Sequence, residues 1–238
     1  MEVSVLTYNI LFNKASEQIK PLVQKYRPDI VCLQEIITTE ENLQNLAFDQ
    51  YQLADFSNSF FKFNKIFGVA TYFNRQKLDL VRSESFNLPR SFLEGLLIVL
   101  RGGNNPRNVL KTKFRLKSGK LISVYTVHLS PWGSNGIRFK QVKETLADLN
   151  KDTSETAIIA GDFNYPYGRK KFEKLIFASN LKEATNNIPY TLEAKSFPFM
   201  SIRLKLDYIL YKNIDLIKTT RIDCRFSDHY PIFSVFDI

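Results

Sequence analysis

The sequence predicts an α+β fold in which two packed, mostly antiparallel or mixed β-sheets are flanked by helices. Three observations lead to this prediction. Short runs of apolar and β-branched residues, bounded by turn residues, recur along the whole chain. Only a few segments have helical spacing, and no repeat, linker or composition shift divides the chain. Many strands with few helices favour sheet packed on sheet, so we expect one domain over residues 1–238.

Each predicted strand is an apolar run of strand length that ends at turn-forming or polar residues. In chain order these runs are 3–10, 29–33, 67–73, 96–100, 109–114, 121–129, 157–161, 206–211 and 231–236. Apolar residues recur at helical spacing over 16–26, a segment that Arg27-Pro28 terminates. The same spacing predicts helices over 40–46, 137–149 and 169–179.

Composition excludes several classes of protein. The chain has 238 residues, 44% hydrophobic and 24% charged, which rules out a disordered or collagen-like chain. Two Cys without a C-x-x-C pair cannot form a disulfide framework, and they suit a reducing compartment. No apolar run approaches the ~20 residues of a transmembrane helix, and residues 1–12 resemble a strand rather than a signal peptide. We therefore expect a cytoplasmic monomer without a transmembrane segment.

The balance of charge is basic. Lys and Arg number 33 against 24 Asp and Glu, for a net charge of +9. Such a protein attracts polyanions, so nucleic acid and an anionic membrane surface are both plausible partners. Residues 101–120 contain seven Lys and Arg and no acid. This basic run is either a contact surface for the partner or a solvated pair of strands.

Polar residues follow several of the predicted strands at the point where each strand ends. Any one of them is explained by capping of a turn. Six such ends in one chain, which include both of its His residues, indicate instead that they converge at one rim of the sandwich. The residues concerned are Asn9, Glu35, His128, Asp162 with Asn164, Asp207, and Asp228 with His229.

These residue types suit a hard divalent cation and a phosphate ester. Glu35 offers carboxylate oxygens and Asn9 an amide oxygen, the ligands preferred by Mg²⁺, with Mn²⁺ as a second possibility. The remaining carboxylates can activate water, and imidazoles can donate to a developing oxyanion. The residues alone do not separate metal ligand from general base among Asp162, Asp207 and Asp228. The chain has no nucleophile elbow, P-loop or dinucleotide fingerprint.

Taken in order, the six motifs resemble those of the endonuclease/exonuclease/phosphatase superfamily, the phosphodiesterases similar to deoxyribonuclease I. A single Gly-Asp-x-Asn or Ser-Asp-His would be a weak signal, but six motifs in family order are a strong one. They are Thr7-Tyr8-Asn9-Ile10, Leu33-Gln34-Glu35, Thr126-Val127-His128-Leu129, Gly161-Asp162-Phe163-Asn164, Leu206-Asp207-Tyr208-Ile209 and Ser227-Asp228-His229-Tyr230-Pro231.

The resemblance implies a four-layer α/β sandwich that forms a single catalytic domain over residues 1–238, with the site at one rim. It implies that Glu35 is the principal ligand of a divalent metal, Mg²⁺ or Mn²⁺. Asn9 would help to hold this metal, and Asp228 would lie near it.

The resemblance also implies roles for the remaining residues. Asp162 would align and activate the attacking water, and Asn164 would bind the scissile phosphate. His229 would contact the phosphate and be oriented by Asp207, a pairing that fixes the tautomer of an imidazole. His128 would be a second imidazole on the phosphate.

The motifs do not select one branch of the superfamily. Asn9-Ile10-Leu11 resembles the deadenylases, whereas His128-Leu129-Ser130, followed by Arg138 and Gln141, resembles tyrosyl-DNA phosphodiesterases and sphingomyelinases. The first hypothesis is a Mg²⁺-dependent nuclease or DNA/RNA-end-processing phosphodiesterase.

Residues 60–65, Phe-Phe-Lys-Phe-Asn-Lys, motivate this hypothesis, because exposed aromatics can stack on bases; a buried strand edge explains them equally well. The alternative is a phosphoesterase for phospholipid headgroups or inositol phosphates, with Trp132 as a membrane-touching aromatic. The third hypothesis is a non-catalytic binding module of the same fold.

Overall fold

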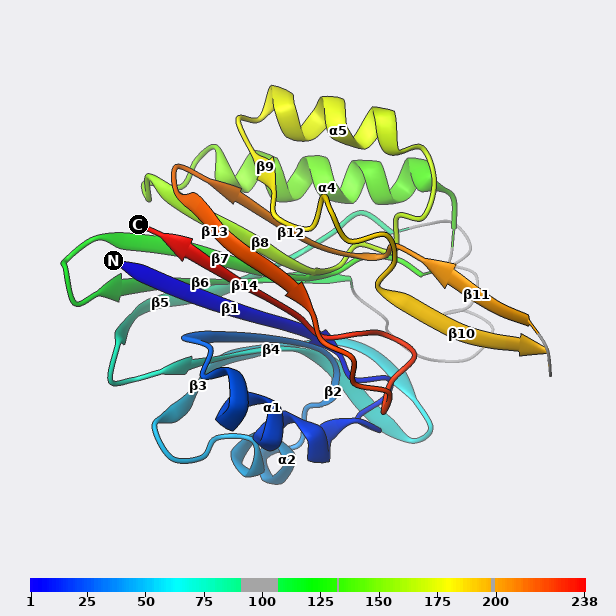
Figure 1. Ribbon diagram of the computed structural model, residues 1–238, viewed down its shortest axis with the longest axis horizontal. Helices are drawn as coiled ribbons and strands as arrows, with labels where there is room; N and C mark the ends of the chain where they lie inside the picture. Colours follow the sequence, from blue (N-terminus) through cyan, green and yellow to red (C-terminus); the bar gives the residue numbers. More distant parts are fainter. Residues whose placement is uncertain (91–106, 132, 198–199) are drawn as a thin grey trace.

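The computed structural model in Figure 1 describes residues 1–90, 107–131, 133–197 and 200–238. Within these residues the strands form two six-stranded sheets and a separate two-stranded ribbon. The two sheets pack face to face with helices on their outer faces, which confirms the predicted four-layer sandwich. The strand predicted over 96–100 and Trp132 lie outside the described residues.

The first sheet is built around the N-terminal strand. β1 (Glu2–Asn9) pairs in parallel with β2 (Ile30–Ile37) and antiparallel with β14 (Ile232–Asp237). Helix α1 (Ile19–Tyr26), which follows a short 3₁₀ turn (Ser16–Gln18), and helix α2 (Glu40–Asn45) pack on its outer face. In spatial order its strands are β13 (Asp215–Arg221), β14 (Ile232–Asp237), β1 (Glu2–Asn9), β2 (Ile30–Ile37), β4 (Lys65–Asn74) and β3 (Tyr51–Lys62).

The second sheet has a matching parallel pair at its centre, β7 with β8. Helices α4 (Asn135–Leu149) and α5 (Arg169–Ala178) cover its outer face. Its strands, in spatial order, are β5 (Leu78–Asn87), β6 (Asn108–Leu116), β7 (Leu121–His128), β8 (Thr156–Asp162), β12 (Asp207–Lys212) and β9 (Lys182–Glu183). The ribbon of β10 (Leu192–Phe197) and β11 (Met200–Leu204) extends from the end of the sandwich opposite the chain termini (Figure 1).

Burial on both faces explains why the central strands are continuous apolar runs rather than alternating ones. In β1, Val3 and Val5 enter the core between the sheets, whereas Leu6 and Tyr8 enter the core beneath the helices. Each buried side chain of this size stabilises the fold by about 1.5–3 kcal/mol. These two cores and a third, between the second sheet and α4 and α5, fix the relative positions of the layers.

The parallel pairs bring the carboxyl ends of four central strands to one end of the sandwich. β1 and β2 run in register from Val5↔Ile30, and β7 and β8 from Ile122↔Thr156. β12 is antiparallel to β8 and therefore begins where β8 ends. The chain termini lie together at the other end, where the Met1 ammonium pairs with Asp237 at 2.6 Å (Figure 1). Among the helices described, none has the length and apolar character needed to span a bilayer.

Candidate active site

Three predicted site residues lie side by side across the rim of the second sheet. His128 ends β7, Asp162 ends β8 and Asp207 begins β12. The strand register pairs His128 with Asp162 and Asp207 with Asp162. All three side chains are buried. Strand pairing therefore places one imidazole and two carboxylates in a single row.

A β-bulge in the first sheet brings Glu35 to the same rim. Glu35 has a left-handed backbone (φ 60°), and the register of β2 with β4 shifts between Gln34 and Ile36. Such a bulge adds one residue to the strand and turns its side chain in a new direction. The Glu35 Oε2 atom accepts a hydrogen bond from the Phe12 N–H (2.9 Å). The first turn after β1 therefore holds this carboxylate.

Asn9 connects the two sheets. It ends β1 opposite Gln34, and its Nδ2 donates to Asp162 Oδ2 (3.0 Å) and to Glu35 Oε1 (3.3 Å). Its Oδ1 accepts from the Leu11 N–H (3.1 Å). The amide thus occupies the place between two carboxylates, and rotation of this amide by half a turn would offer its oxygen to a cation instead.

The loop after β8 fixes the Asp162 carboxylate. Gly161 has φ 144°, and a Cβ at this position would collide with the carbonyl oxygen of Val127, so only glycine fits. Asn164, also left-handed (φ 48°), donates its backbone N–H to Asp162 Oδ1 (2.8 Å), and its Nδ2 donates to the Leu129 carbonyl (3.2 Å). Asn164 therefore lies beside the site, and its second amide hydrogen has no partner among the residues that the structure describes.

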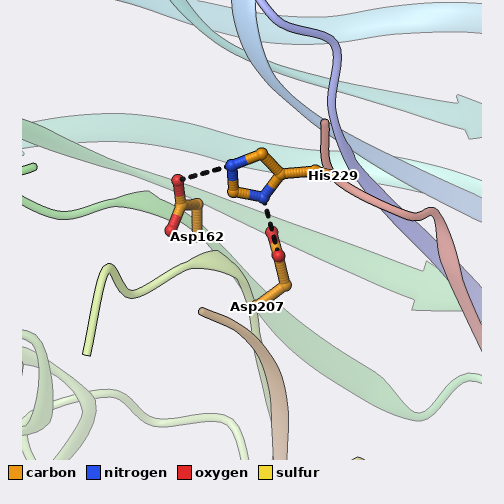
Figure 2. A group of neighbouring side chains, drawn as sticks. All are labelled: Asp162, Asp207 and His229. Carbon is orange, nitrogen blue, oxygen red and sulfur yellow. Dashed lines mark hydrogen bonds and ion pairs between the residues drawn. The ribbon is translucent and has the colours of Figure 1, made fainter. Parts of the chain in front are cut away.

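His229 forms a buried dyad with Asp207. Figure 2 shows the imidazole between two carboxylates, with Nδ1 2.8 Å from Asp207 Oδ2 and Nε2 3.8 Å from Asp162 Oδ2. Burial by itself lowers the pKa of His229, but the carboxylates of Asp207 and Asp162 outweigh it and raise this pKa to about 10. Thr191 Oγ1 donates to the same Asp207 oxygen (2.7 Å) and fixes the dyad further. The two carboxylates thus favour the protonated form of His229.

His128 has the opposite character. Its Nε2 lies 3.7 Å from Asp162 Oδ2 and 3.8 Å from Glu35 Oε1. Burial, reinforced by the nearby charges of Arg107 and His229, lowers the pKa of His128 well below its usual value. One buried imidazole is therefore cationic and the other neutral.

The carboxylates of Glu35 and Asp162 lie in surroundings that disfavour their charged form. Burial raises the pKa of Glu35, although His229 and the Phe12 N–H partly oppose this effect. Burial likewise raises the pKa of Asp162 to about 7, against the opposing charge of His229. A bound cation would relieve both carboxylates.

The donor set fits a hard divalent ion. Glu35 and Asp162 supply carboxylate oxygens and Asn9 an amide between them, which matches the oxygen ligands of Mg²⁺ and Mn²⁺. Ligand atoms of Asp162, Asp207 and His229 also lie within 4.8 Å of one another. This buried group could therefore also hold a metal ion.

Asp228 lies at the edge of this constellation. Its side chain is half-buried, and its Oδ1 accepts a hydrogen bond from Ser227 Oγ (3.3 Å). Its charge contributes to raising the pKa of Glu35 and His229. A role near the metal therefore stays a prediction for Asp228.

The comparisons with known proteins agree with this geometry. The model of the Endonuclease/Exonuclease/phosphatase family matches residues 6–229, from β1 to His229. The chain belongs to this endonuclease/exonuclease/phosphatase family. Among curated proteins, none matches the chain. Family membership makes the protein a phosphoester hydrolase.

Solved structures of this family share the fold at low sequence identity. The human Nocturnin catalytic domain with bound sulfate is 21% identical, with a TM-score of 0.74 over 99% of this chain and 94% of that one. D. rerio TDP2 in complex with a single-strand DNA product is 17% identical, with a TM-score of 0.73 over 100% and 99%. A mannosyl-6-phosphatase of Bacteroides thetaiotaomicron is 16% identical, with a TM-score of 0.74 over 99% and 100%.

Several residues that support the family site carry no sequence signal of their own. Thr191 orients Asp207 from a loop, and Phe12 holds Glu35 through its backbone. Ser227 belongs to a recognised motif, and the structure shows its contact: its Oγ donates to the Asn9 carbonyl (2.8 Å) and accepts from the His229 N–H (3.1 Å). Except for the local contact with His229, these contacts arise from the tertiary fold, because each one joins residues that are distant in the chain.

Arg138 and Gln141 on α4 support the loop that follows His128. Arg138 Nε donates to the Ser130 carbonyl (2.8 Å), and Gln141 Nε2 donates to Ser130 Oγ (2.7 Å). Both side chains are buried. In this structure the two residues hold the loop in place.

Proposed function

We propose that the protein is a Mg²⁺-dependent phosphodiesterase that cleaves nucleic acid by in-line attack of water on a phosphorus atom. The observation that carries this proposal is the meeting of Asp162, His229 and Glu35 from three distant segments around one small volume. A base, a cationic hydrogen-bond donor and a cation-binding carboxylate are the parts that this reaction needs.

Asp162 serves as the base that orients the attacking water and accepts its proton. Burial raises the pKa of Asp162 to about 7, close to the value at which a general base works best at neutral pH. Asn164, whose backbone N–H holds the Asp162 carboxylate, contributes its side-chain amide to binding of the scissile phosphate.

His229 and His128 act on the phosphate oxygens. The His229 imidazolium, oriented by Asp207, donates a charge-assisted hydrogen bond to the oxygen on which negative charge develops. The neutral His128 adds a second imidazole close to the same oxygen of Asp162. A neutral imidazole donates without adding a second full charge to a crowded site.

Glu35 is the principal candidate for holding the divalent ion, with Asn9 and Asp228 beside it. When bound, Mg²⁺ would neutralise charge on the phosphate and favour ionisation of the carboxylates. Mn²⁺ has the same preference for oxygen ligands and is the expected substitute.

Nucleic acid is the substrate class favoured by the charge of the chain. The net charge of +9 attracts a polyanion, and the similar TDP2 structure holds a single-strand DNA product. Two residues of the basic run over 101–120 do not contribute to this attraction. Arg107 and Lys111 are buried, and Lys111 is paired with acids. The polyanion-binding charge therefore has to come from other basic residues. A phospholipid headgroup or an inositol phosphate would use the same catalytic groups.

The test is a substrate panel: single-stranded DNA, duplex DNA, RNA, 5′-tyrosyl DNA, an inositol phosphate and sphingomyelin vesicles, each with Mg²⁺, Mn²⁺ or EDTA. We expect metal-dependent cleavage of a nucleic acid that weakens steeply with salt. Turnover of the lipid or the inositol phosphate alone would assign the alternative substrate class. Equal, undetectable turnover by the protein and its D162N and H229A variants across the panel would indicate a binding module.

A further inference from the structure

The turn between β3 and β4 places an aromatic side chain in an unfavourable backbone conformation. Phe63 and Asn64 form a two-residue turn between the paired Lys62 and Lys65, and both have left-handed φ values, 51° and 57°. Such turns favour Asn, Asp and Gly, whereas a bulky residue at positive φ costs about 1–3 kcal/mol. The Phe63 side chain is nonetheless 68% exposed. Burial of this ring does not account for the strain, so the ring needs another explanation.

A row of rings joins this turn to the active site. The ring centroid of Phe63 lies 5.7 Å from that of Phe12, which lies 6.1 Å from that of Phe60. Phe60 in turn lies 6.1 Å from the His128 imidazole. The backbone N–H of Phe12 donates to Glu35 Oε2. Phe63 is therefore the exposed end of a row of rings. The other end of the row contacts His128, and Phe12 within the row also contacts Glu35.

A cation accompanies the exposed ring. Lys62 Nζ lies 4.8 Å from the centroid of Phe63 and 3.9 Å from that of Phe12. Lys65 is paired with Lys62 in the strand register, so a second basic residue stands at the base of the turn. An exposed ring beside basic side chains is the arrangement that single-stranded nucleic acids bind, with bases on the ring and phosphates on the cations.

We infer that the β3–β4 turn is a subsite for a nucleobase near the scissile phosphate. The base stacks on Phe63, and a neighbouring phosphate pairs with Lys62 or Lys65. Phe12 is a positioning residue, because it contacts both the subsite and Glu35. The inference rests on the proposed function. It means that the protein recognises a planar base of its substrate in addition to the phosphate backbone.

The test compares two labelled single strands of equal length in Mg²⁺, one of thymidine nucleotides and one with tetrahydrofuran abasic residues in their place. In F63A we expect kcat/KM to fall about five- to a hundredfold on the thymidine strand and to stay unchanged on the abasic strand. F63W should restore cleavage of the thymidine strand. The matched control is F177A, which removes another exposed phenylalanine (84% exposed) at the end of α5 and should change neither rate.

A second variant separates substrate binding from a structural role of the ring. F63N relieves the backbone strain, so its melting temperature should not fall, while its kcat/KM on the thymidine strand should fall as in F63A. If wild type cleaves no nucleic acid of the substrate panel, the proposed function itself fails; if it cleaves another nucleic acid but neither of these strands, the subsite is wrong. If wild type cleaves both strands and the Phe63 variants change both rates equally, or neither, the subsite alone is wrong. F63N and F63W decide the question if F63A does not fold.

Discussion

This molecule has two clusters of charged side chains in which the pKa values of buried acids shift in opposite directions. In the first, Lys111 lies on β6 within ion-pair distance of Asp152 (2.7 Å), Asp148 (2.9 Å) and Glu84 (3.1 Å). Burial by itself raises the pKa of Asp152, but hydrogen bonds from Lys111, Ser154 and Lys113 together outweigh burial and lower this pKa. The same acids raise the pKa of Lys111 against its own burial. In this first cluster the three acids are matched by three cations, because Arg82 also pairs with Glu84 and Lys113 with Asp152. Each group in this cluster stabilises the charge of the next.

The second cluster is the candidate active site, where four acids among the described residues, Glu35, Asp162, Asp207 and Asp228, accompany the single cationic side chain of His229. Glu35 and Asp162 both have a raised pKa, because burial penalises their charge more than the nearby groups compensate for it. His229, the imidazolium beside them, is already paired with Asp207. Acids matched by lysines build structure, whereas acids that are short of a cation mark a place for a metal, a proton transfer or both.

The largest effect should come from removing the charge of Asp162. In D162N the carboxamide cannot accept a proton from water, so we expect kcat to fall about 10³-fold or more. The matched variant is D152N in the lysine cluster, which should leave kcat unchanged. Steady-state rates with Mg²⁺ measure this difference, and a D162N enzyme with more than a tenth of the wild-type kcat would contradict the role of Asp162.

The reverse experiment removes the lysine from the structural cluster. K111M leaves Asp152, whose side chain is 1% exposed, with Lys113 as its remaining ion-pair partner among the described residues and with the Ser154 N–H. We expect the free energy of unfolding to fall by about 3 kcal/mol. Urea titration measures the loss, and kcat should stay unchanged at temperatures where the variant is folded. A K111M protein as stable as wild type would show that the lysine cluster does not stabilise the fold.

Stabilisation of the folded protein by Mg²⁺ should depend on the active-site cluster and not on the lysine cluster, and this effect should be somewhat smaller than that of K111M. Mg²⁺ at a free concentration a hundredfold above its Kd should stabilise the wild type by about 2.7 kcal/mol. E35Q should lose most of this stabilisation, while K111M should keep it. Thermal melting with and without EDTA tests this expectation, and equal stabilisation of E35Q and wild type would move the metal away from Glu35.

The central strands and the helices follow from the sequence because they are buried. The predicted helix over 16–26 matches the 3₁₀ turn and α1, and the run over 121–129 matches β7. Six of the described strands were not predicted: β3, β5, β9 and β13, and the two strands of the ribbon, β10 and β11. The first four are the edge strands of the two large sheets, and their residues are mostly exposed or half-buried. Edge strands have only one neighbour and little apolar surface to bury, so their hydrophobic pattern is weak.

The residues of the candidate site could be listed from the sequence, but their geometry could not. The left-handed bulge at Glu35 and the Asn9 amide between two carboxylates arise only when both sheets are packed together. The neutral state of His128 and the charged state of His229 likewise depend on burial and on partners distant in the chain. The two imidazoles are the same residue type, so no local pattern distinguishes them.

The smallest effect is the pH dependence of the rate, which should follow the active-site cluster and not the lysine cluster. Asp162 must be ionised to accept a proton, and its pKa is raised to about 7, so kcat/KM should rise with pH and level off near or below 7 in Mg²⁺, since a nearby cation favours the ionised form. On this acid limb the rate changes up to tenfold per pH unit. His229, with a pKa of about 10, must keep its proton, so the rate should fall again only at strongly alkaline pH. K111M should keep the shape of this profile, because the acids that Lys111 pairs with lie outside the catalytic cluster. A rate that is flat between pH 5 and 9 would mean that Asp162 is not the base.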